Sequence, residues 1–380
     1  MAGPLEGVKV LDLSQVVSGP LAAAWLADQG AEVVKVETKG LGDIGRWVGP
    51  RKEDVSALFL TVNRGKKSVA LDLKNSDRHR ALLDALIADT DVLVENFRPG
   101  AMARLGLEPA MLLKKHPRLI ICSITGFGPK GPYAQGRVYD PLIQAASGHA
   151  AAQRDPATGD PKLIQTIVCD KTTGLAASQA ITAALYAREK TGAGQHVEIS
   201  MLDTAVAFLW ADGLYNETFL ENDAPPYPDL GAFYHLWRTS DGWVALASVQ
   251  DAEYAATCRA LDRPDLIEDP RFESLHGRVV NHKALTEILK NLISARTTED
   301  VLRRMAEEDA PAAPVNDRST LFEDPQLEAN GSIVEFEHGA LGPVRQARHP
   351  ARFSGAPCDM PRPAPRLGAD TEALLSKYLG

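Results

Sequence analysis

The sequence predicts an α/β fold in which a large domain with a parallel sheet is joined by two linkers to a smaller α+β domain. Apolar, strand-like runs alternate with helical stretches in the first half of the chain, and two proline-rich segments interrupt the second half. The length of 380 residues also exceeds what a single core usually organises. The predicted boundaries are 1–220 for the N-terminal part of the large domain, 221–231 for a linker, 232–310 for the small domain, 311–330 for a return linker, and 331–380 for a tail that packs on the large domain.

The first predicted element is a βαβ unit close to the N-terminus. Residues 8–13 are apolar and β-prone, and residues 33–36 resume the strand pattern. Between them, Ser18 suits a helix N-cap with Pro20 in the first turn, and Gly30 suits a C-cap. Together with Glu37 at the end of the second strand, this unit suits a ribose or phosphate ligand, and it equally suits a plain crossover that binds nothing.

Strand and helix patterns continue in alternation, which predicts a parallel sheet covered by helices and a Rossmann-like outline. The strands are expected at 69–73, 92–94, 119–124, 163–168 and 195–200, and the helices at 76–89, 109–115, 171–188 and from about 203.

The small domain is expected to begin with a hairpin that turns at Ser240-Asp241-Gly242. Its strands are predicted at 233–238 and 243–247 and its helices at 251–262, 281–294 and 298–308, between linkers that carry Pro225, Pro226 and Pro228 on one side and Pro311 and Pro314 on the other. The tail has a strand-like run at 333–336 and a last helix from Thr371.

The charge balance argues against a nucleic-acid partner, because a net charge of −9 opposes binding to phosphate backbones. One local basic cluster suits an anionic small ligand, or alternatively an ordinary solvated face. Set against Glu53 and Asp54, its members are Arg46, Arg51, Lys52, Arg64, Lys66 and Lys67.

The absence of targeting, membrane-spanning and metal-binding patterns bears on the expected compartment and metal content. It shows no signal-peptide pattern and no apolar run that could span a bilayer, so we expect a cytoplasmic protein without a membrane partner. The cysteines lie far apart without C-x-x-C pairs or histidines at metal-ligand spacing, which predicts free thiols and no metal. They are Cys122, Cys169, Cys258 and Cys358.

A G-x-G-x-x-G pattern at 126–131 follows a strand and invites a nicotinamide-dehydrogenase interpretation. Its context opposes that interpretation, because Pro129 and Pro132 interrupt the segment and no helix opens there to hold a pyrophosphate. A turn built from glycine and proline is the better interpretation.

Asp170 is the candidate nucleophile. It follows the apolar run 163–168 and precedes a helix, so it could simply be an N-cap carboxylate. The same position favours its charged form, which makes it available for attack at neutral pH. Cys169 is the neighbouring alternative, although no histidine partner is evident and side chains alternate along a strand.

Four motifs carry a family resemblance that extends over nearly the whole chain, from LEGVKVLD at 5–12 to RPAPRLG at 362–368. The motifs are GAEVVKVE at 30–37, NRGKKS at 63–68, VENFRPG at 94–100 and TGAGQHV at 191–197. With them the chain resembles the family III CoA-transferases, whose relatives include formyl-CoA:oxalate and carnitine CoA-transferases and α-methylacyl-CoA racemases.

The resemblance implies a homodimer of two interlocked rings that binds CoA or acyl-CoA as a substrate, with no tightly bound cofactor and no metal. It implies Asp170 as the nucleophile, which passes through a mixed anhydride and an aspartyl-CoA thioester. Arg98, Arg104 and Arg137 would pair with phosphates. The full set of implied CoA-binding residues is Val17, Ser18, Leu71, Asp72, Leu73, Lys74, Asn96, Phe97, Arg98, Arg104, Arg137, Val138, Tyr139 and Asp140.

Two departures from the family pattern bear on the reaction. Tyr139 stands where the racemase branch has a histidine, which favours transfer over α-proton exchange, and 243–250 lacks the glycine run of the formyl-CoA:oxalate enzymes. A racemase or isomerase of the same fold and a CoA-binding protein without catalysis remain the alternatives. The acids are not identified, and four aromatic residues could line an acyl pocket or be ordinary core, namely Trp210, Tyr215, His235 and Trp237.

Overall fold

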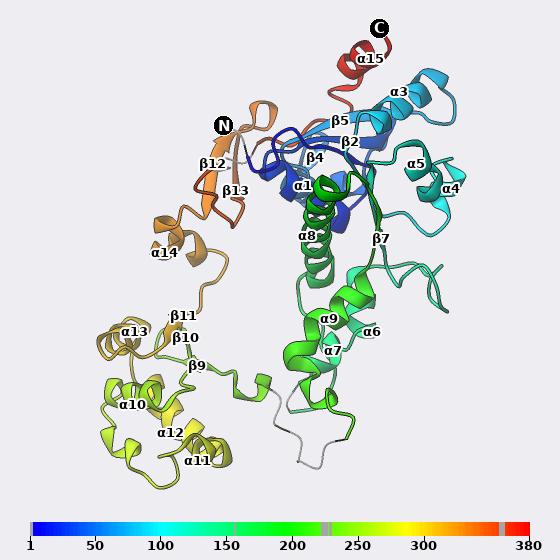
Figure 1. The fold of residues 1–380 in the computed structure, drawn as a ribbon. Coiled ribbons are helices and arrows are strands. Elements are labelled where there is room, and N and C mark those ends of the chain that lie inside the picture. Colours follow the sequence, from blue (N-terminus) through cyan, green and yellow to red (C-terminus); the bar gives the residue numbers. More distant parts are fainter. Residues whose placement is uncertain (1–2, 156, 222–226, 228–229, 357–361) are drawn as a thin grey trace. The chain divides into compact units, whose positions relative to one another are not determined.

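The computed structural model describes residues 3–155, 157–221, 227, 230–356 and 362–380. The chain divides into two compact units, which are described separately below (Figure 1). Unit 1 comprises Met1–Tyr215 and Gly331–Gly380, and unit 2 comprises Asn216–Asn330. The predicted linker prolines Pro225, Pro226 and Pro228 lie outside the described residues, as does Cys358.

Unit 1 is built on a six-stranded sheet in which all strands run parallel, as the sequence predicted. Its spatial order is β5-β2-β1-β6-β7-β8, so its strands numbered along the chain lie in the order 3-2-1-4-5-6 of a Rossmann fold. The order reverses between β1 and β6, which makes their carboxyl ends the expected place for a ligand. The strands are β1 (Lys9–Asp12), β2 (Glu32–Thr38), β5 (Lys66–Leu71), β6 (Val92–Glu95), β7 (Ile120–Thr125) and β8 (His196–Ser200).

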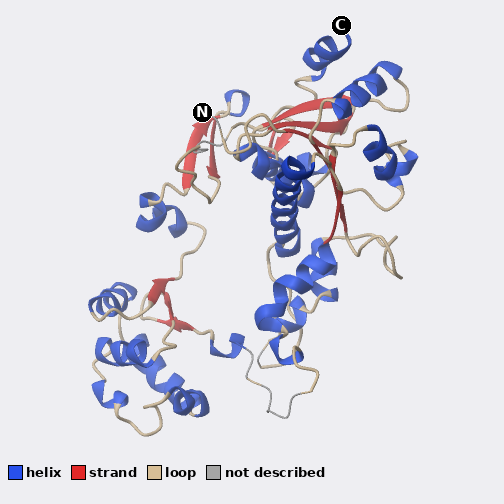
Figure 2. Ribbon diagram, in the orientation of Figure 1, coloured by secondary structure: helices blue, strands red, loops and turns tan. Residues whose placement is uncertain are grey.

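Helices cover both faces of this sheet (Figure 2). Side chains alternate along a strand, so Val10 joins a core against α1 (Ser18–Asp28) and α8 (Val168–Thr191), whereas Leu11 joins a core on the other face. That second core includes residues of α3 (Asp77–Ala88), α4 (Ala101–Arg104), α5 (Pro109–Lys115) and α15 (Thr371–Leu379).

Smaller elements complete unit 1. Near α8 lie α6 (Asp140–Ala146), α7 (His149–Ala152) and α9 (Met201–Gly213). The remainder are the short turn η1 (Ile44–Trp47), β3 (Arg51–Lys52), β4 (Val55–Ser56), α2 (Ala57–Val62), β12 (Ile333–Glu337), η6 (Gly339–Leu341) and β13 (Pro343–Ala347).

Unit 2 packs helices against a three-stranded antiparallel sheet, β11-β10-β9. The predicted hairpin is confirmed as β9 (Leu236–Arg238) and β10 (Trp243–Leu246), and Ala312–Pro314 adds β11. The core gathers Trp237, Val244, Ile293, Val301 and Met305. The helices are α10 (Asp251–Ala260), α11 (Leu275–Val280), α12 (His282–Ser294), α13 (Thr298–Glu307) and α14 (Pro325–Ala329), of which α11 and α14 were not predicted.

The predicted strand at 163–168 is wrong. Its backbone makes no sheet ladder; instead the Gln144 side chain accepts from Ile164 N at 2.9 Å and donates to Thr166 O at 3.2 Å. Helix α8 then begins at Val168, so Asp170 is its third residue and not the N-cap. Ser18 is likewise the first residue of α1, while Val17 occupies the cap position without a side-chain cap bond.

Candidate active site

Asp170 lies in the first turn of α8, against the first turn of α1. Gly174, one turn further along α8, makes this approach possible, because a Cβ there would lie 2.9 Å from the carbonyl oxygen of Ser18. The backbone N–H and the hydroxyl of Ser18 lie near the Asp170 carboxylate and favour its charged form. The helix start therefore presents two donors to a single carboxylate.

A buried carboxylate, Asp140, binds the backbone of Asp170. Its Oδ2 accepts the Asp170 backbone N–H at 2.9 Å, and its Oδ1 accepts from Gln144 Nε2 at 2.6 Å. Since Gln144 also binds the segment 164–166, one side chain of α6 fixes both Asp140 and the entry to α8.

The surroundings of Asp170 raise the pKa of its carboxyl to about 6. Burial is the largest cause, the like charge of Asp140 adds to it, and the nearby N–H and hydroxyl of Ser18 oppose it. At neutral pH the group is ionised and is more basic than a solvent-exposed carboxylate, which suits a nucleophile.

Cys169 is a poor alternative nucleophile. Burial raises the pKa of its thiol to about 12, with further contributions from the charges of Asp140 and Asp170. The thiol is therefore protonated at neutral pH and inert. Strand alternation, the reason given from sequence, does not apply, since both residues lie in α8.

The CoA-binding residues expected from the sequence fall in segments at the carboxyl ends of parallel strands, and so at one edge of the sheet. Across the switch point the loops after β1 and β6 are joined, because Gln15 N donates to Asn96 Oδ1 and Asn96 Nδ2 donates to Gln15 O, each at 2.8 Å. Val17 and Ser18 follow β1, Leu71 to Lys74 end β5, Asn96 to Arg98 and Arg104 follow β6, and Arg137 to Asp140 follow β7.

These residues differ in what they can offer a ligand. The side chains of Arg98, Arg104 and Arg137 are exposed, and none forms an ion pair with another described residue. Those of Val17 and Leu71 are each 3% exposed and belong to the core, so only their backbone can face a ligand.

The segment between β1 and α1 rests on a paired-charge cluster, which we define as Asp12, Lys35, Asp43 and Lys66. Lys66 Nζ lies 2.7 Å from Asp12 Oδ2, and Lys35 Nζ lies 2.9 Å from Asp43 Oδ2. Lys35 also donates to Ser14 O at 2.8 Å, and Lys66 to Pro20 O at 2.8 Å.

The paired-charge cluster holds an uncommon backbone conformation. Val16 has φ 69°, a left-handed value that a β-branched residue rarely adopts, and its N–H donates to Asp43 Oδ1 at 3.0 Å. Gly19 is also required, because a Cβ there would lie 2.3 Å from Ser14 Cβ. The cluster thereby fixes the segment that ends at Ser18.

The three buried members of the basic cluster at 46–67 are not available to a ligand. They are already paired, Arg46 with Glu37, Arg64 with Asp28 and Lys66 with Asp12. Glu37 Oε1 and Oε2 each lie 2.7 Å from Arg46 nitrogens, so the carboxylate suggested for a ribose is occupied.

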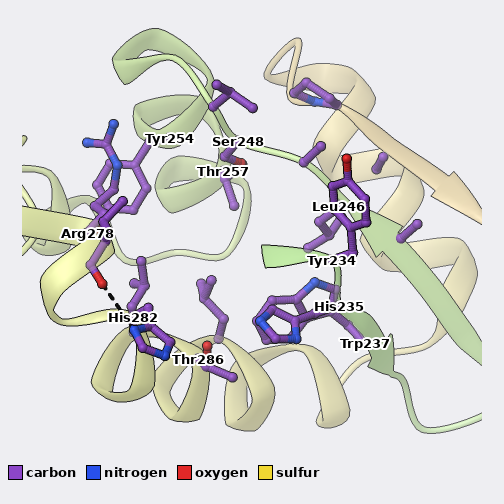
Figure 3. A pocket seen from close by; sticks show the side chains of 18 of the residues that line it. Tyr234, His235, Trp237, Leu246, Ser248, Tyr254, Thr257, Arg278, His282 and Thr286 are labelled. Carbon is purple, nitrogen blue, oxygen red and sulfur yellow. Dashed lines mark hydrogen bonds between the residues drawn. The ribbon is translucent and has the colours of Figure 1, made fainter. Parts of the chain in front are cut away.

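The aromatic residues considered for an acyl pocket belong to different units, Trp210 and Tyr215 to unit 1 and His235 and Trp237 to unit 2. Trp210 lines a hollow formed with residues of α6 and α9 in unit 1, and Tyr215 does not line it. His235 and Trp237 line a separate pocket within unit 2 (Figure 3).

Sequence reasoning missed Gln144 and Gly174 and assigned Asp140 only a role in binding CoA. The spacing of Gly174, four residues after Asp170 in a predicted helix, was a usable signal for close helix packing. The 126–131 glycine segment forms a loop, as predicted. In the described part of the chain, no helix is long and apolar enough to cross a membrane, and no three His, Cys, Asp or Glu residues form a metal-binding group.

Comparison with known proteins gives consistent results. A family model described as CoA-transferase family III matches residues 5–371. Human succinyl-CoA:glutarate CoA-transferase is 35% identical over 382 residues, covering 99% of this chain and 86% of that protein. Formyl-CoA:oxalate CoA-transferase of Escherichia coli O157:H7 is 33% identical over 405 residues, covering 99% and 96%. The crystal structure of a CAIB/BAIF family protein from Brucella suis aligns with a TM-score of 0.85 at 32% identity, covering 100% of both chains.

Proposed function

Since the chain belongs to CoA-transferase family III, we propose that it moves CoA from an acyl-CoA thioester to a carboxylic acid by way of Asp170. The observation that carries the proposal is the environment of this carboxylate. It is partly buried beside a second carboxylate, lies near the N–H and hydroxyl of Ser18, and has its pKa raised to about 6. A carboxyl whose pKa is raised by burial and by a neighbouring like charge is a candidate for a functional group.

The first half of the reaction loads CoA onto the enzyme. An Asp170 oxygen attacks the thioester carbonyl, the C–S bond breaks, and CoA leaves as a thiolate, which gives a mixed anhydride. The thiolate then attacks the aspartyl carbonyl carbon, so the anhydride C–O bond breaks and the donor acid leaves as a carboxylate. Asp170 is now a thioester of CoA.

The second half reverses these steps with the acceptor acid. The acceptor carboxylate attacks the aspartyl thioester and releases the CoA thiolate, forming a second anhydride. The thiolate attacks the acceptor carbonyl, which gives the new acyl-CoA and regenerates the Asp170 carboxylate. Atoms and charge balance without a metal or redox cofactor.

Two features of the site would favour these steps. When Asp170 is acylated it loses its charge, and the repulsion from Asp140 that raises its pKa is relieved. The N–H and hydroxyl of Ser18, which lie near the carboxylate, would stabilise the oxyanions of the tetrahedral intermediates that form on the aspartyl carbonyl.

CoA would bind along the edge formed by the carboxyl ends of the strands. The exposed Arg98, Arg104 and Arg137 are available for its phosphates, and the loops after β1, β5, β6 and β7 supply the other contacts nominated from the sequence. The homodimer of interlocked rings that the family resemblance implies is part of this proposal. The relatives act, by their names, on glutarate and oxalate, so dicarboxylic acids belong in any acceptor panel.

The test compares Asp170→Ala with Cys169→Ala on a panel of acyl-CoA donors and acids. Asp170→Ala is expected to lower transfer by about 10³-fold or more while CoA still binds, because the loss of a nucleophile removes the covalent route. Cys169→Ala should retain transfer, since its thiol is not involved.

Transfer by Asp170→Ala at the wild-type rate would overturn the proposal. Running the assay in heavy water adds a second readout. Deuterium entering the α-position of acyl-CoA without any acceptor acid would indicate a racemase or isomerase, and CoA binding without turnover by wild-type protein would indicate a non-catalytic role.

A further inference from the structure

Lys66, the first residue of β5, extends into the interior of unit 1, where its side chain is fully buried. Its ammonium donates to three acceptors, Asp12 Oδ2 at 2.7 Å, Pro20 O at 2.8 Å and Asn63 Oδ1 at 2.8 Å. An ammonium has three hydrogens to donate and no lone pair to accept with. The three contacts therefore use every hydrogen of the charged group.

Two of these acceptors lie on either side of Ser18 along the chain. Asp12 ends β1, and its Oδ1 accepts from the Ser14 N–H at 2.9 Å and from the Ser14 hydroxyl. Pro20 lies in the first turn of α1, a helix whose start has no side-chain cap bond. Lys66 thereby ties the strand end before Ser18 to the helix turn after it, and so fixes a helix start that lacks a cap.

The charged groups that face Lys66 are the other members of the paired-charge cluster, Asp12, Lys35 and Asp43. Two lysines and two aspartates cancel, so loss of the Lys66 proton would leave a net negative charge in the interior. The neutral amine would also have two hydrogens for three acceptors, so one contact would be lost. Burial is the largest cause that lowers the pKa of Lys66 to about 8; the charge of Lys35 adds to it, and the two aspartates oppose it.

Loss of this proton does not by itself unfold the protein. The folded pKa of Lys66, about 8, lies below the unfolded value of 10.5, so between these values the unfolded chain binds more protons at this residue. The contribution of Lys66 to the free energy of unfolding therefore rises with pH across that window. A change of local order that sets in near pH 8 is thus separable from global unfolding.

We propose that Lys66 is a positioning residue whose three ammonium donors hold the segment 13–20, so that Ser18 stays beside Asp170, and that loss of its proton releases this segment. The inference rests on the proposed function, in which Ser18 stabilises charge on the reacting group. Lys66 acts through Ser18 and not on the reacting atoms. The upper pH limit of transfer is then set by Lys66, and the lower limit by Asp170.

Hydrogen exchange of the full chain, followed by mass spectrometry between pH 6.5 and pH 9.5, tests this without turnover. Each backbone N–H of 13–16 has an acceptor in the structure, so this stretch reports on the segment. Its protection factor, which corrects for faster intrinsic exchange at high pH, should fall about fivefold from pH 7 to pH 9, the effect of about one lost hydrogen bond. The core strand β7 is the internal reference and should keep its protection.

Lys66→Met removes the ammonium, so the protection of 13–16 should be low and independent of pH. Lys67→Met is the matched control, because Lys67 pairs with Glu32 at the surface, and it should behave as wild type does. If Lys66→Met does not fold, Asn63→Ala decides. Losing one acceptor of the ammonium lowers the pKa of Lys66, so the midpoint of the change should move to lower pH.

Transfer is measured over the same pH range with the panel of acyl-CoA donors and acids. In wild type and Lys67→Met, kcat/KM should fall above about pH 8, with the same midpoint as the protection of 13–16. A fall in protection while transfer stays constant to pH 9.5 would overturn the proposal.

The proposal is also overturned if the protection of 13–16 does not change between pH 7 and pH 9, or if β7 loses protection to the same extent. The same holds if Lys66→Met keeps the wild-type pH dependence, or if a folded Asn63→Ala leaves the midpoint unmoved. Because hydrogen exchange needs no substrate, absence of transfer with every donor and acid would contradict the proposed function and leave the test of Lys66 intact.

Discussion

Two groups of buried or partly buried carboxylates lie against the same segment, 13–20, and differ in how their charge is balanced. In the paired-charge cluster, Asp12 lies between Lys35 and Lys66, whose charges outweigh its burial and lower its pKa to about 2. At the other group, Asp140 and Asp170 have no cation among their described partners, and the pKa of Asp170 rises to about 6.

The difference distinguishes carboxylates that stabilise the fold from a carboxylate that can react. A carboxylate that is fully paired with cations is held in its charged form and has little reason to react, but it fixes the backbone around it. A carboxylate that is buried beside a like charge gains by becoming neutral, through protonation or acylation. In this molecule the paired-charge cluster positions Ser18. We infer that Asp170, beside Asp140, reacts next to Ser18.

Breaking the paired-charge cluster should have the largest effect on stability. Lys66→Met leaves Asp12 with one cation fewer, and it should lower the free energy of unfolding by about 3–5 kcal/mol, the cost of breaking a buried pair. The next residue is the control, because Lys67 pairs with Glu32 at the surface with 46% of its side chain exposed. Lys67→Met should change stability by only about 0.5 kcal/mol. Chemical denaturation measures both, and equal losses would contradict the comparison.

Neutralising Asp170 should have the opposite effect and raise the free energy of unfolding. The folded pKa lies above the unfolded value, so its penalty develops as pH rises from 3.8 to about 6 and is complete above that window. Asp170→Asn should therefore stabilise the protein by about 1–3 kcal/mol at pH 7.5, while transfer is lost. Below pH 4 the stability gain should disappear. Denaturation curves of both proteins at the two pH values test this, and destabilisation at pH 7.5 would contradict it.

The pH dependence of transfer should show the same group with a smaller effect. Since the nucleophile must be ionised, kcat/KM should fall about tenfold per pH unit below about pH 6. Asp140→Asn removes the like charge and should move this midpoint to lower pH. Rate profiles of wild type and variant provide the measurement, and a midpoint that stays fixed or rises would show that Asp140 does not tune Asp170.

The sheet could be predicted from the sequence because its evidence is local. The pattern of each apolar strand and each intervening helix can be recognised within a few consecutive residues. The motifs at 30–37, 63–68, 94–100 and 191–197 identified the family that the comparisons confirm. Asp170 could be nominated because the family resemblance implies it as the nucleophile, whereas its position before a helical pattern alone equally suited an N-cap.

The rest depended on contacts between distant residues. The apolar run 163–168 looked like a strand, but Gln144 takes its backbone bonds. Lys66 looked like part of an exposed basic cluster because its partner, Asp12, is 54 positions away. The pKa of Asp170 likewise depends on Asp140, which is 30 positions earlier. No local pattern reveals such pairs.

The most direct test of the central claim is mass spectrometry of wild type, Asp170→Ala and Cys169→Ala after incubation with an acyl-CoA panel and no acceptor acid. We expect an acyl or CoA adduct on the peptide that contains Asp170 in wild type and in Cys169→Ala, and none in Asp170→Ala. An adduct on another residue, or full transfer without any adduct on Asp170, would contradict it.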